Sequence, residues 1–432
     1  MRKFLYLIMT VVIISCNNNS KQDLSDRSGR YIGLFKKGSF KDSIVFEMER
    51  DSTSWKVFFS SLEQNANRIP FRELEAKDDS INFKLQSDFH TYSFKNLWAN
   101  NNSELRGSLT VDTMKVPYTL YKTLSVIKGA PVSEDISFET NELMLNGTIY
   151  YPSKDNKKGL VIVTSSGNSD RSASRAEAQL FAKRGYTTFI YDKRGTGISE
   201  GNWSQASIEE LASDDINAIK WFTEKTTIPI KNIGIKGSSQ GASKIPYILN
   251  ELKDLKYGIA VSCPGSTLLE SDLNYWKNRN IEKLEDNIEE ATNFERKVFE
   301  TIAGENSIEA LEKEINAAKS KAWFNMVWIP NLNEIEIDRK LKYSPLPYFE
   351  KIKQPILIVQ GSMDEIIPED SYEMITKSLE KAQNIAYEII LLEGASHSMY
   401  DVGQNDFPYW SKLHPKYISV LENWINHLPV TN

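Results

Sequence analysis

The chain has 432 residues, which is more than one hydrophobic core usually serves, so we expect two domains. Its content of 40% hydrophobic and 25% charged residues excludes global disorder. The formal net charge of -6 offers no cluster of basic charge, so a nucleic-acid partner is excluded.

The first 16 residues have the pattern of an export signal. Met1-Arg2-Lys3 is basic, residues 4–14 are almost wholly apolar, and Ser15-Cys16 then meets a polar run. An apolar run of about 11 residues is too short to span a bilayer and suits a signal peptide. The small residue before Cys16 resembles a bacterial lipobox, so we predict lipidation of Cys16. The chain would then be anchored in the bacterial cell envelope, facing the periplasm or the cell surface. The alternative is an ordinary signal peptide with an incidental cysteine.

The next segments are predicted to be a tether and a small β domain. Residues 17–26 are polar and unpatterned, as in a flexible tether. Within 27–125, short runs alternate between apolar and polar residues, which predicts an antiparallel all-β domain, either a barrel or a sandwich. The predicted strands are 43–48, 55–59, 80–85, 93–94, 104–109 and 118–121. Three roles stay open for this domain: it binds a glycan, it packs over a site on the rest of the chain, or it spaces the rest of the chain from the membrane.

Cysteine and histidine are scarce. A lipidated Cys16 would leave Cys263 alone, so no internal disulfide is expected. None of the four histidines, His90, His397, His414 and His427, pairs with another His or Cys at a ligand spacing. We therefore predict no metal, and nothing in the sequence implies a cofactor.

Residues 132–430 alternate between apolar strands and amphipathic helices, which predicts a doubly wound, mostly parallel α/β sheet. The predicted strands are 159–163, 187–191, 233–235, 257–261, 356–359 and 387–392, with helices at 173–184, 208–224 and 372–381. Residues from about 266 to 348 interrupt this rhythm with charged, helix-favouring sequence, including 281–299 and 307–322. We interpret this insertion as a helical cap above the carboxyl ends of the strands, where α/β sheets bind ligands.

The segment Gly237-Ser238-Ser239-Gln240-Gly241 lies between the strand 233–235 and a helical stretch. It is a G-x-S-x-G motif in the context of a nucleophile elbow, in which small residues allow the tight strand-to-helix turn. Ser239 is therefore the predicted nucleophile. The backbone N–H of Gln240 would lie at a helix N-terminus, where it can stabilise an oxyanion.

A serine nucleophile needs a base and an orienting carboxylate, and both follow in the order Ser, Asp, His. Asp364 comes just after the strand 356–359, and His397 just after the strand 387–392. Glu365, Glu369 and Asp370 are alternative acids that lie later in the loop. A turn aspartate and a surface histidine are the structural alternatives.

Residues 135–430 resemble the α/β-hydrolase superfamily, in particular its esterases and its serine aminopeptidase-like and dienelactone-hydrolase-like members. The resemblance rests on the nucleophile turn, on the acid and base loops, on residues 191–199 (YDKRGTGIS) and on residues 164–171. Residues 191–199 look like the family's D-x-R-G-x-G-x-S loop, a structural element. Residues 164–171 (TSSGNSDR) occupy the oxyanion-loop position, where relatives often begin with His-Gly. The resemblance implies the backbone N–H of Ser166 as second oxyanion donor, with Gly167 as its alternative. Residues 27–125, with Gly29-Arg30-Tyr31-Ile32-Gly33, also resemble the β module found ahead of some secreted esterases of this type.

We therefore expect a serine hydrolase that cleaves carboxylic esters of small molecules through an acyl-enzyme. The alternatives are a serine aminopeptidase or thioesterase with the same triad, or a lipoprotein binding module without turnover. The sequence leaves the oligomeric state open.

Overall fold

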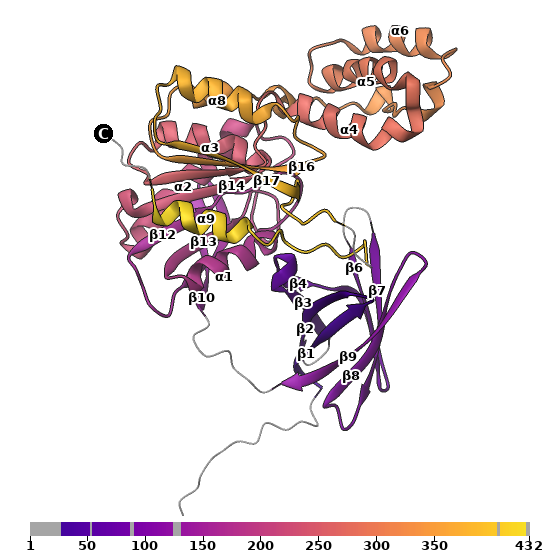
Figure 1. Ribbon diagram of the computed structural model, residues 1–432, viewed down its shortest axis with the longest axis vertical. Helices are drawn as coiled ribbons and strands as arrows, with labels where there is room; N and C mark the ends of the chain where they lie inside the picture. The colour runs from indigo at the N-terminus through magenta and orange to yellow at the C-terminus, as the bar shows by residue number, and fades with distance from the viewer. Residues whose placement is uncertain (1–26, 52–53, 87–89, 124–130, 404–406, 429–432) are drawn as a thin grey trace, which may run out of the picture.

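The computed structural model describes residues 27–51, 54–86, 90–123, 131–403 and 407–428. The predicted lipidation site Cys16 and the predicted tether 17–26 lie outside these ranges. Two sheets organise the described residues, one with nine strands and one with eight (Figure 1).

The nine-stranded sheet, residues 29–123, is called the β module below. Every pairing in it is antiparallel, in the order β4-β3-β2-β1-β9-β8-β7-β6-β5. The sheet curls until its edge strands β4 and β5 approach, joined through Phe71, whose N–H donates to the Val57 carbonyl at 2.9 Å. It is thus a single, nearly closed sheet, a barrel and not a sandwich. Its strands are β1 Gly29–Lys37, β2 Phe40–Arg50, β3 Trp55–Ser61, β4 Ala66–Pro70, β5 Arg72–Lys77, β6 Ser80–Gln86, β7 Thr91–Ala99, β8 Glu104–Val111 and β9 Met114–Thr123.

Aromatic side chains fill the interior of the β module. Along β2 the buried positions alternate with exposed ones, as expected for a strand with one face on a core. The interior holds Phe35, Phe46, Phe59, Phe83 and Phe94, each no more than 1% exposed. The same core cluster includes Phe407 and Trp410 from the other end of the chain, which the sequence did not predict.

The eight-stranded sheet has the order β10-β11-β13-β12-β14-β15-β16-β17. The strands from β13 to β17 are parallel, and β10 and β11 form an antiparallel edge. All six predicted strands of this sheet are present. The chain order reverses around β12 and β14, which makes a topological switch point, the usual ligand site of such sheets. Its strands are β10 Val132–Thr140, β11 Leu143–Tyr151, β12 Lys158–Ile162, β13 Tyr186–Asp192, β14 Ile233–Ser238, β15 Tyr257–Val261, β16 Ile356–Met363 and β17 Tyr387–Ser396.

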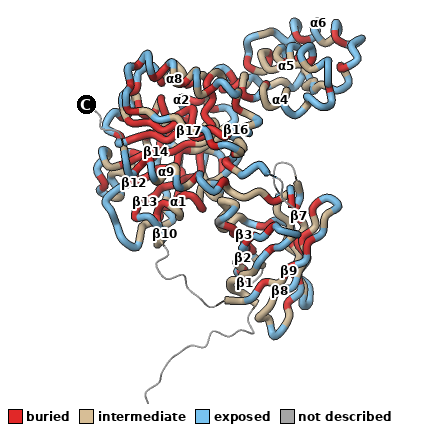
Figure 2. The backbone as a smooth tube through the Cα atoms, in the orientation of Figure 1, coloured by how far each residue is buried: buried red, intermediate tan, exposed pale blue. Residues whose placement is uncertain are grey.

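Helices cover both faces of this sheet, which confirms the predicted doubly wound α/β-hydrolase fold. On one face, α1 (Arg175–Lys183) and α9 (Tyr417–Asn426) pack on the sheet. The other face is covered by α2 (Ile208–Thr226), α3 (Gln240–Glu251) and α8 (Ser371–Lys381). Figure 2 shows the result, with buried residues concentrated in the sheet between the two helical layers.

The predicted cap is present between β15 and β16. Its main helices are α4 (Leu268–Leu284), α5 (Ile288–Ile302) and α6 (Ile308–Ala318), followed by the short α7 (Leu346–Phe349). Helices α4 to α6 form a separate body at the upper right of Figure 1, with a core of their own around Phe294 and Trp323. The predicted helical run 281–299 is broken, because Glu285 has a positive φ of 46° and Asp286 and Asn287 favour turns.

Within the described ranges, no helix is both long and apolar enough to cross a membrane. The predicted domain limits, 27–125 and 132–430 with the cap at about 266–348, stay predictions, since they concern which parts fold independently.

Candidate active site

Ser239, the predicted nucleophile, lies on the sharp turn between β14 and α3. Its φ of 55° and ψ of -126° are unusual for a residue with a side chain, and such backbone strain is typical of functional turns. A Cβ on Gly237 would come within 2.4 Å of the Gly241 carbonyl oxygen, and one on Gly241 within 2.9 Å of the Thr164 oxygen. Both glycines are therefore required. The Ser239 side chain makes no capping bond to α3, so its hydroxyl is not engaged by the helix that it precedes.

Asp364 and His397 are joined directly. Nδ1 of His397 lies 2.9 Å from Oδ1 and 3.1 Å from Oδ2 of Asp364. The Asp364 side chain is 1% exposed and also accepts the N–H groups of Ile366 and Ile367 at 3.0 and 2.9 Å. Since a carboxylate can only accept hydrogen bonds, Nδ1 is the donor in this contact and the lone pair of the imidazole is on Nε2.

Glu365, the nearest alternative acid, has a different role. Its Oε2 accepts the backbone N–H of His397 at 3.3 Å, whereas the imidazole Nδ1 contacts Asp364. The geometry therefore favours Asp364 as the carboxylate that orients His397.

Two residues at the end of β15 link the nucleophile turn to the histidine loop. The N–H of Ser239 donates to the Val261 carbonyl at 2.9 Å. The next residue, Ser262, is fully buried, has a positive φ of 50°, and donates its hydroxyl to the His397 carbonyl at 2.8 Å. The backbones of Ser239 and His397 are thus held by adjacent residues of one strand end.

The predicted oxyanion loop lies beside the nucleophile turn. Ser165 Oγ donates to the Ser238 carbonyl at 2.8 Å, which ties the loop to the turn. Ser166 is exposed, and Gly167 follows it with a φ of 63°, a backbone conformation that strains a residue with a side chain. Gln240 is the first residue of α3. Both predicted donors therefore lie at the carboxyl edge of the sheet, on the elements that the sequence indicated.

Beneath this loop lies a buried ion pair that the sequence analysis did not single out. Lys244 of α3 and Asp215 of α2 are 0% and 1% exposed, and their charged atoms are 2.5 Å apart. Lys244 also donates to Thr164 Oγ1 at 2.8 Å, while Asp215 accepts from the Tyr191 hydroxyl at 2.5 Å. The pair joins both helices to the start of the oxyanion loop.

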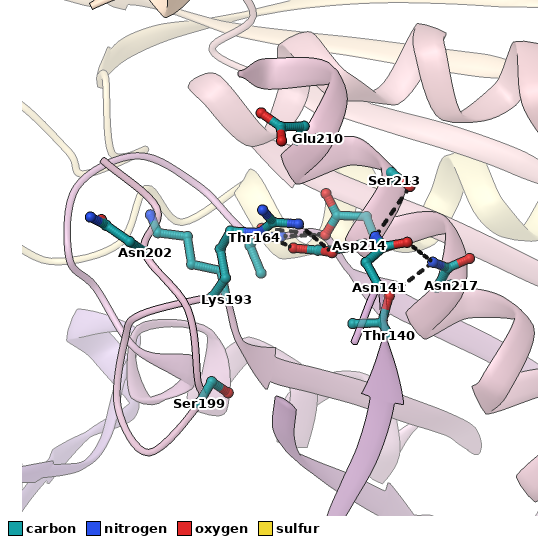
Figure 3. Close-up of polar contacts among 12 residues, drawn as sticks. Thr140, Asn141, Thr164, Lys193, Ser199, Asn202, Glu210, Ser213, Asp214 and Asn217 are labelled. Carbon is teal, nitrogen blue, oxygen red and sulfur yellow. Dashed lines mark hydrogen bonds and ion pairs between the residues drawn. The ribbon is translucent and has the colours of Figure 1, made fainter. Parts of the chain in front are cut away.

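The loop that follows β13 is fastened in the same region (Figure 3). Arg194 makes two bonds to the Asp214 carboxylate, at 2.7 and 2.9 Å, and Asn141 donates to the same carboxylate at 3.0 Å. Asn217 donates to Thr140 Oγ1 at 2.8 Å. These bonds hold the YDKRGTGIS loop and the β10–β11 turn against α2, which gives this motif the structural role implied by its resemblance.

Lys193 of the same motif faces the oxyanion loop. Its Nζ donates to the Ser165 carbonyl, and the side chain lies 4.9 Å from the Trp203 ring centroid. Burial, together with the nearby charge of Lys244, lowers the pKa of Lys193 to about 7. No local pattern distinguishes this lysine from a surface lysine, so the sequence could not have identified it.

The other three histidines lie elsewhere. His90 pairs with Asp112 in the β module, His414 contacts the Glu393 carbonyl, and His427 contacts the Asn423 carbonyl. A hollow of about 630 Å³ lies at the opposite, amino-terminal edge of the sheet, around Lys256 and Pro355, and contains none of the predicted site residues.

Comparison with known proteins gives the family. The family model described as X-Pro dipeptidyl-peptidase (S15 family) matches residues 143–398. An uncharacterized protein of Mycobacterium tuberculosis is 23% identical over 239 residues, which are 55% of this chain and 64% of its own length. The chain thus spans less than two thirds of that relative.

Two solved structures illustrate the structural similarity. An esterase of Pyrococcus furiosus is 18% identical with a TM-score of 0.46, covering 69% of this chain and 92% of its own. The acylaminoacyl peptidase of Pyrococcus horikoshii is 15% identical with a TM-score of 0.47, covering 92% and 71%. Since the family model spans more than half of the sequence, the chain belongs to the X-Pro dipeptidyl-peptidase S15 family of serine hydrolases.

Proposed function

We propose that this hydrolase cleaves carboxylic esters of small molecules through an acyl-enzyme on Ser239. The observation that carries the proposal is the bond between His397 Nδ1 and the buried Asp364 carboxylate, at the sheet edge where the Ser239 turn lies. A base oriented by a carboxylate is what a weakly nucleophilic hydroxyl needs at neutral pH.

In the first half-reaction, Nε2 of His397 takes the Ser239 proton while Oγ bonds to the substrate carbonyl carbon. The N–H groups of Gln240 and Ser166 stabilise the negative oxygen of the tetrahedral intermediate. That intermediate collapses, the ester C–O bond breaks, and His397 returns the proton to the departing alkoxide. Water then repeats these steps on the acyl-enzyme, releasing the acid and free Ser239.

A second candidate is a peptidase that releases short N-terminal peptides, which the description of the matching family model favours. The same three residues serve both reactions. An amine is a poorer leaving group than an alkoxide, so amide cleavage places a greater demand on proton donation by His397. Ester cleavage is therefore the activity that this constellation supports with the fewest further requirements.

A substrate panel separates these candidates. The purified protein is assayed on p-nitrophenyl esters of increasing chain length and on aminoacyl and X-Pro p-nitroanilides, with Ser239→Ala as the matched control. Ester turnover that Ser239→Ala abolishes supports the proposal, and turnover of anilides alone supports the peptidase. Equal rates for the two proteins would reject catalysis by Ser239 and favour a binding protein.

We further propose that Cys16 carries lipid and anchors the enzyme in a bacterial cell envelope. The support is the basic and apolar N-terminus followed by Ser15-Cys16. Metabolic labelling with an alkyne fatty acid should mark the full chain and leave Cys16→Ala unmarked. Equal labelling of both would reject the anchor.

A further inference from the structure

The β module encloses a piece of the catalytic part of the chain. Phe407 and Trp410, which follow His397 in sequence, are 0% and 2% exposed within the β-module core. Trp410 stacks on Phe35, with ring centroids 5.1 Å apart, and meets Phe59 edge-on at 5.4 Å. Since these side chains help to fill the interior, the barrel serves as a socket for this segment.

A buried carboxylate fixes the depth and orientation of Trp410. Asp42 occupies an inward-facing position of β2 and is 1% exposed. Its Oδ2 accepts the indole N–H of Trp410 at 2.7 Å, and Ser61 Oγ lies 2.9 Å from both carboxylate oxygens. Burial raises the pKa of Asp42, and the bond from Trp410 opposes that rise. Burying a carboxylate costs free energy, and the hydrogen bond from the Trp410 indole offsets part of that cost. This bond forms only when the Trp410 side chain has the depth and orientation seen here.

The segment after Trp410, residues 412–414, forms a bridge from the β module to the turn that carries His397. Leu413 donates its N–H to the Glu63 carbonyl of the β module at 2.6 Å, and Lys412 pairs with the Glu63 carboxylate. The same segment is hydrogen-bonded to residues 399–401. The backbone N–H of Asp401 donates to the Lys412 carbonyl at 2.8 Å, and the backbone N–H of His414 donates to the Met399 carbonyl at 2.7 Å. Residues 412–414 are therefore bonded to both parts.

Residues 399–401 are the returning arm of the turn that carries His397. Ser396 donates its N–H to the Tyr400 carbonyl at 2.8 Å, and Met399 donates to the Ser396 carbonyl at 2.9 Å. The Tyr400 hydroxyl donates to the Gln64 carbonyl of the β module at 3.2 Å. A displacement of the bridge would thus move the backbone that bears the imidazole.

We propose that the β module is a positioning element for His397. By binding Trp410 and residues 412–413, it holds in place the turn that carries His397. This inference rests on the proposed function of His397. It assigns the β module a task in catalysis, and Trp410 and Asp42 are positioning residues because they act through the turn. A base misplaced by about 1 Å can lower a rate 100-fold without changing how substrate binds.

The test compares two buried tryptophans of the same core. Trp410→Ala removes the indole of the inserted segment from the β-module core. The control Trp98→Ala removes from the same core a ring that packs on Trp55, with centroids 5.6 Å apart, and not on residues 407–414. Both should lower the melting temperature. Trp410→Ala should lower kcat on a short ester at least ~10-fold with little change in KM, and slow fluorophosphonate labelling equally. Trp98→Ala should keep a kcat close to that of wild type.

A conservative pair tests the same point without emptying the core. Asp42→Asn keeps an acceptor for the indole and should retain kcat, whereas Asp42→Leu should reproduce the loss seen with Trp410→Ala. If Trp410→Ala does not fold, this pair and Trp410→Phe, which should show an intermediate loss, decide the matter.

Equal kcat losses in Trp410→Ala and Trp98→Ala, or unchanged kcat in Asp42→Leu, would overturn the inference. Failure of the proposed function is distinct, because wild type and Ser239→Ala would then have equal activity.

Discussion

Replacing Lys244 by Met should destabilise the fold strongly, because it leaves the Asp215 carboxylate in the interior without its cation. The pair is at most 1% exposed, and removing one partner of such a pair costs about 3–5 kcal/mol. Asp215→Leu should cost a similar amount by leaving the ammonium alone. The double variant should cost much less than the sum, about 1–3 kcal/mol, because only neutral donors such as the Tyr191 hydroxyl lose their acceptor.

The assay is guanidinium denaturation of the wild type, the two single variants and the double variant, followed by far-UV circular dichroism. The interaction energy comes from the complete cycle. The double variant should also recover part of the ester-hydrolysis rate lost in Lys244→Met, since Thr164 at the start of the oxyanion loop is bonded to both residues. Costs that simply add in the double variant would refute the view that each charge is retained to neutralise the other.

Asp364→Asn should lower kcat by roughly 10³–10⁴-fold, whereas Glu365→Gln should stay near wild type in the same ester assay; similar losses would exclude Asp364 as the orienting acid. Because the pKa of Lys193 falls from 10.5 unfolded to about 7 folded, the unfolded chain binds more protons between these values, so stability should rise with pH there. Lys193→Met should flatten this rise in a melting-temperature series, and an unchanged slope would contradict it. Burial raises the pKa of Glu295 from 4.5 to about 7, so its contribution to stability is lost as pH rises through 7. Glu295→Gln, which still accepts the Trp328 N–H, should melt above wild type at pH 8 and close to it at pH 4.5; a pH-independent difference would count against this reasoning.

The α/β sheet could be predicted because its central strands, β12 to β16, are buried on both faces and are therefore rich in continuous apolar runs. The nucleophile turn could be located because its two glycines are sterically required where β14 meets α3. Asp364 and His397 could be located because both follow parallel strands, whose carboxyl ends share one edge of the sheet.

The buried charges could not be predicted, because each depends on a partner far away in the sequence. Lys236, just before the nucleophile turn, is 4% exposed and bonds to Glu177 of α1 at 2.7 Å. Locally it is indistinguishable from a solvated lysine. The insertion of Trp410 into the β module could not be predicted either, because residues 403–411 have no periodicity that indicates a buried segment. One signal was available: Asp42 is an acidic residue at an inward position between Phe40 and Ile44.

The most direct test of the central claim is active-site labelling by a fluorophosphonate, read by mass spectrometry of the intact protein and of its peptides. We expect one adduct per chain, located on Ser239, that forms much more slowly in His397→Gln. An adduct on another residue, or equal labelling rates with and without the imidazole, would contradict catalysis by Ser239 and His397.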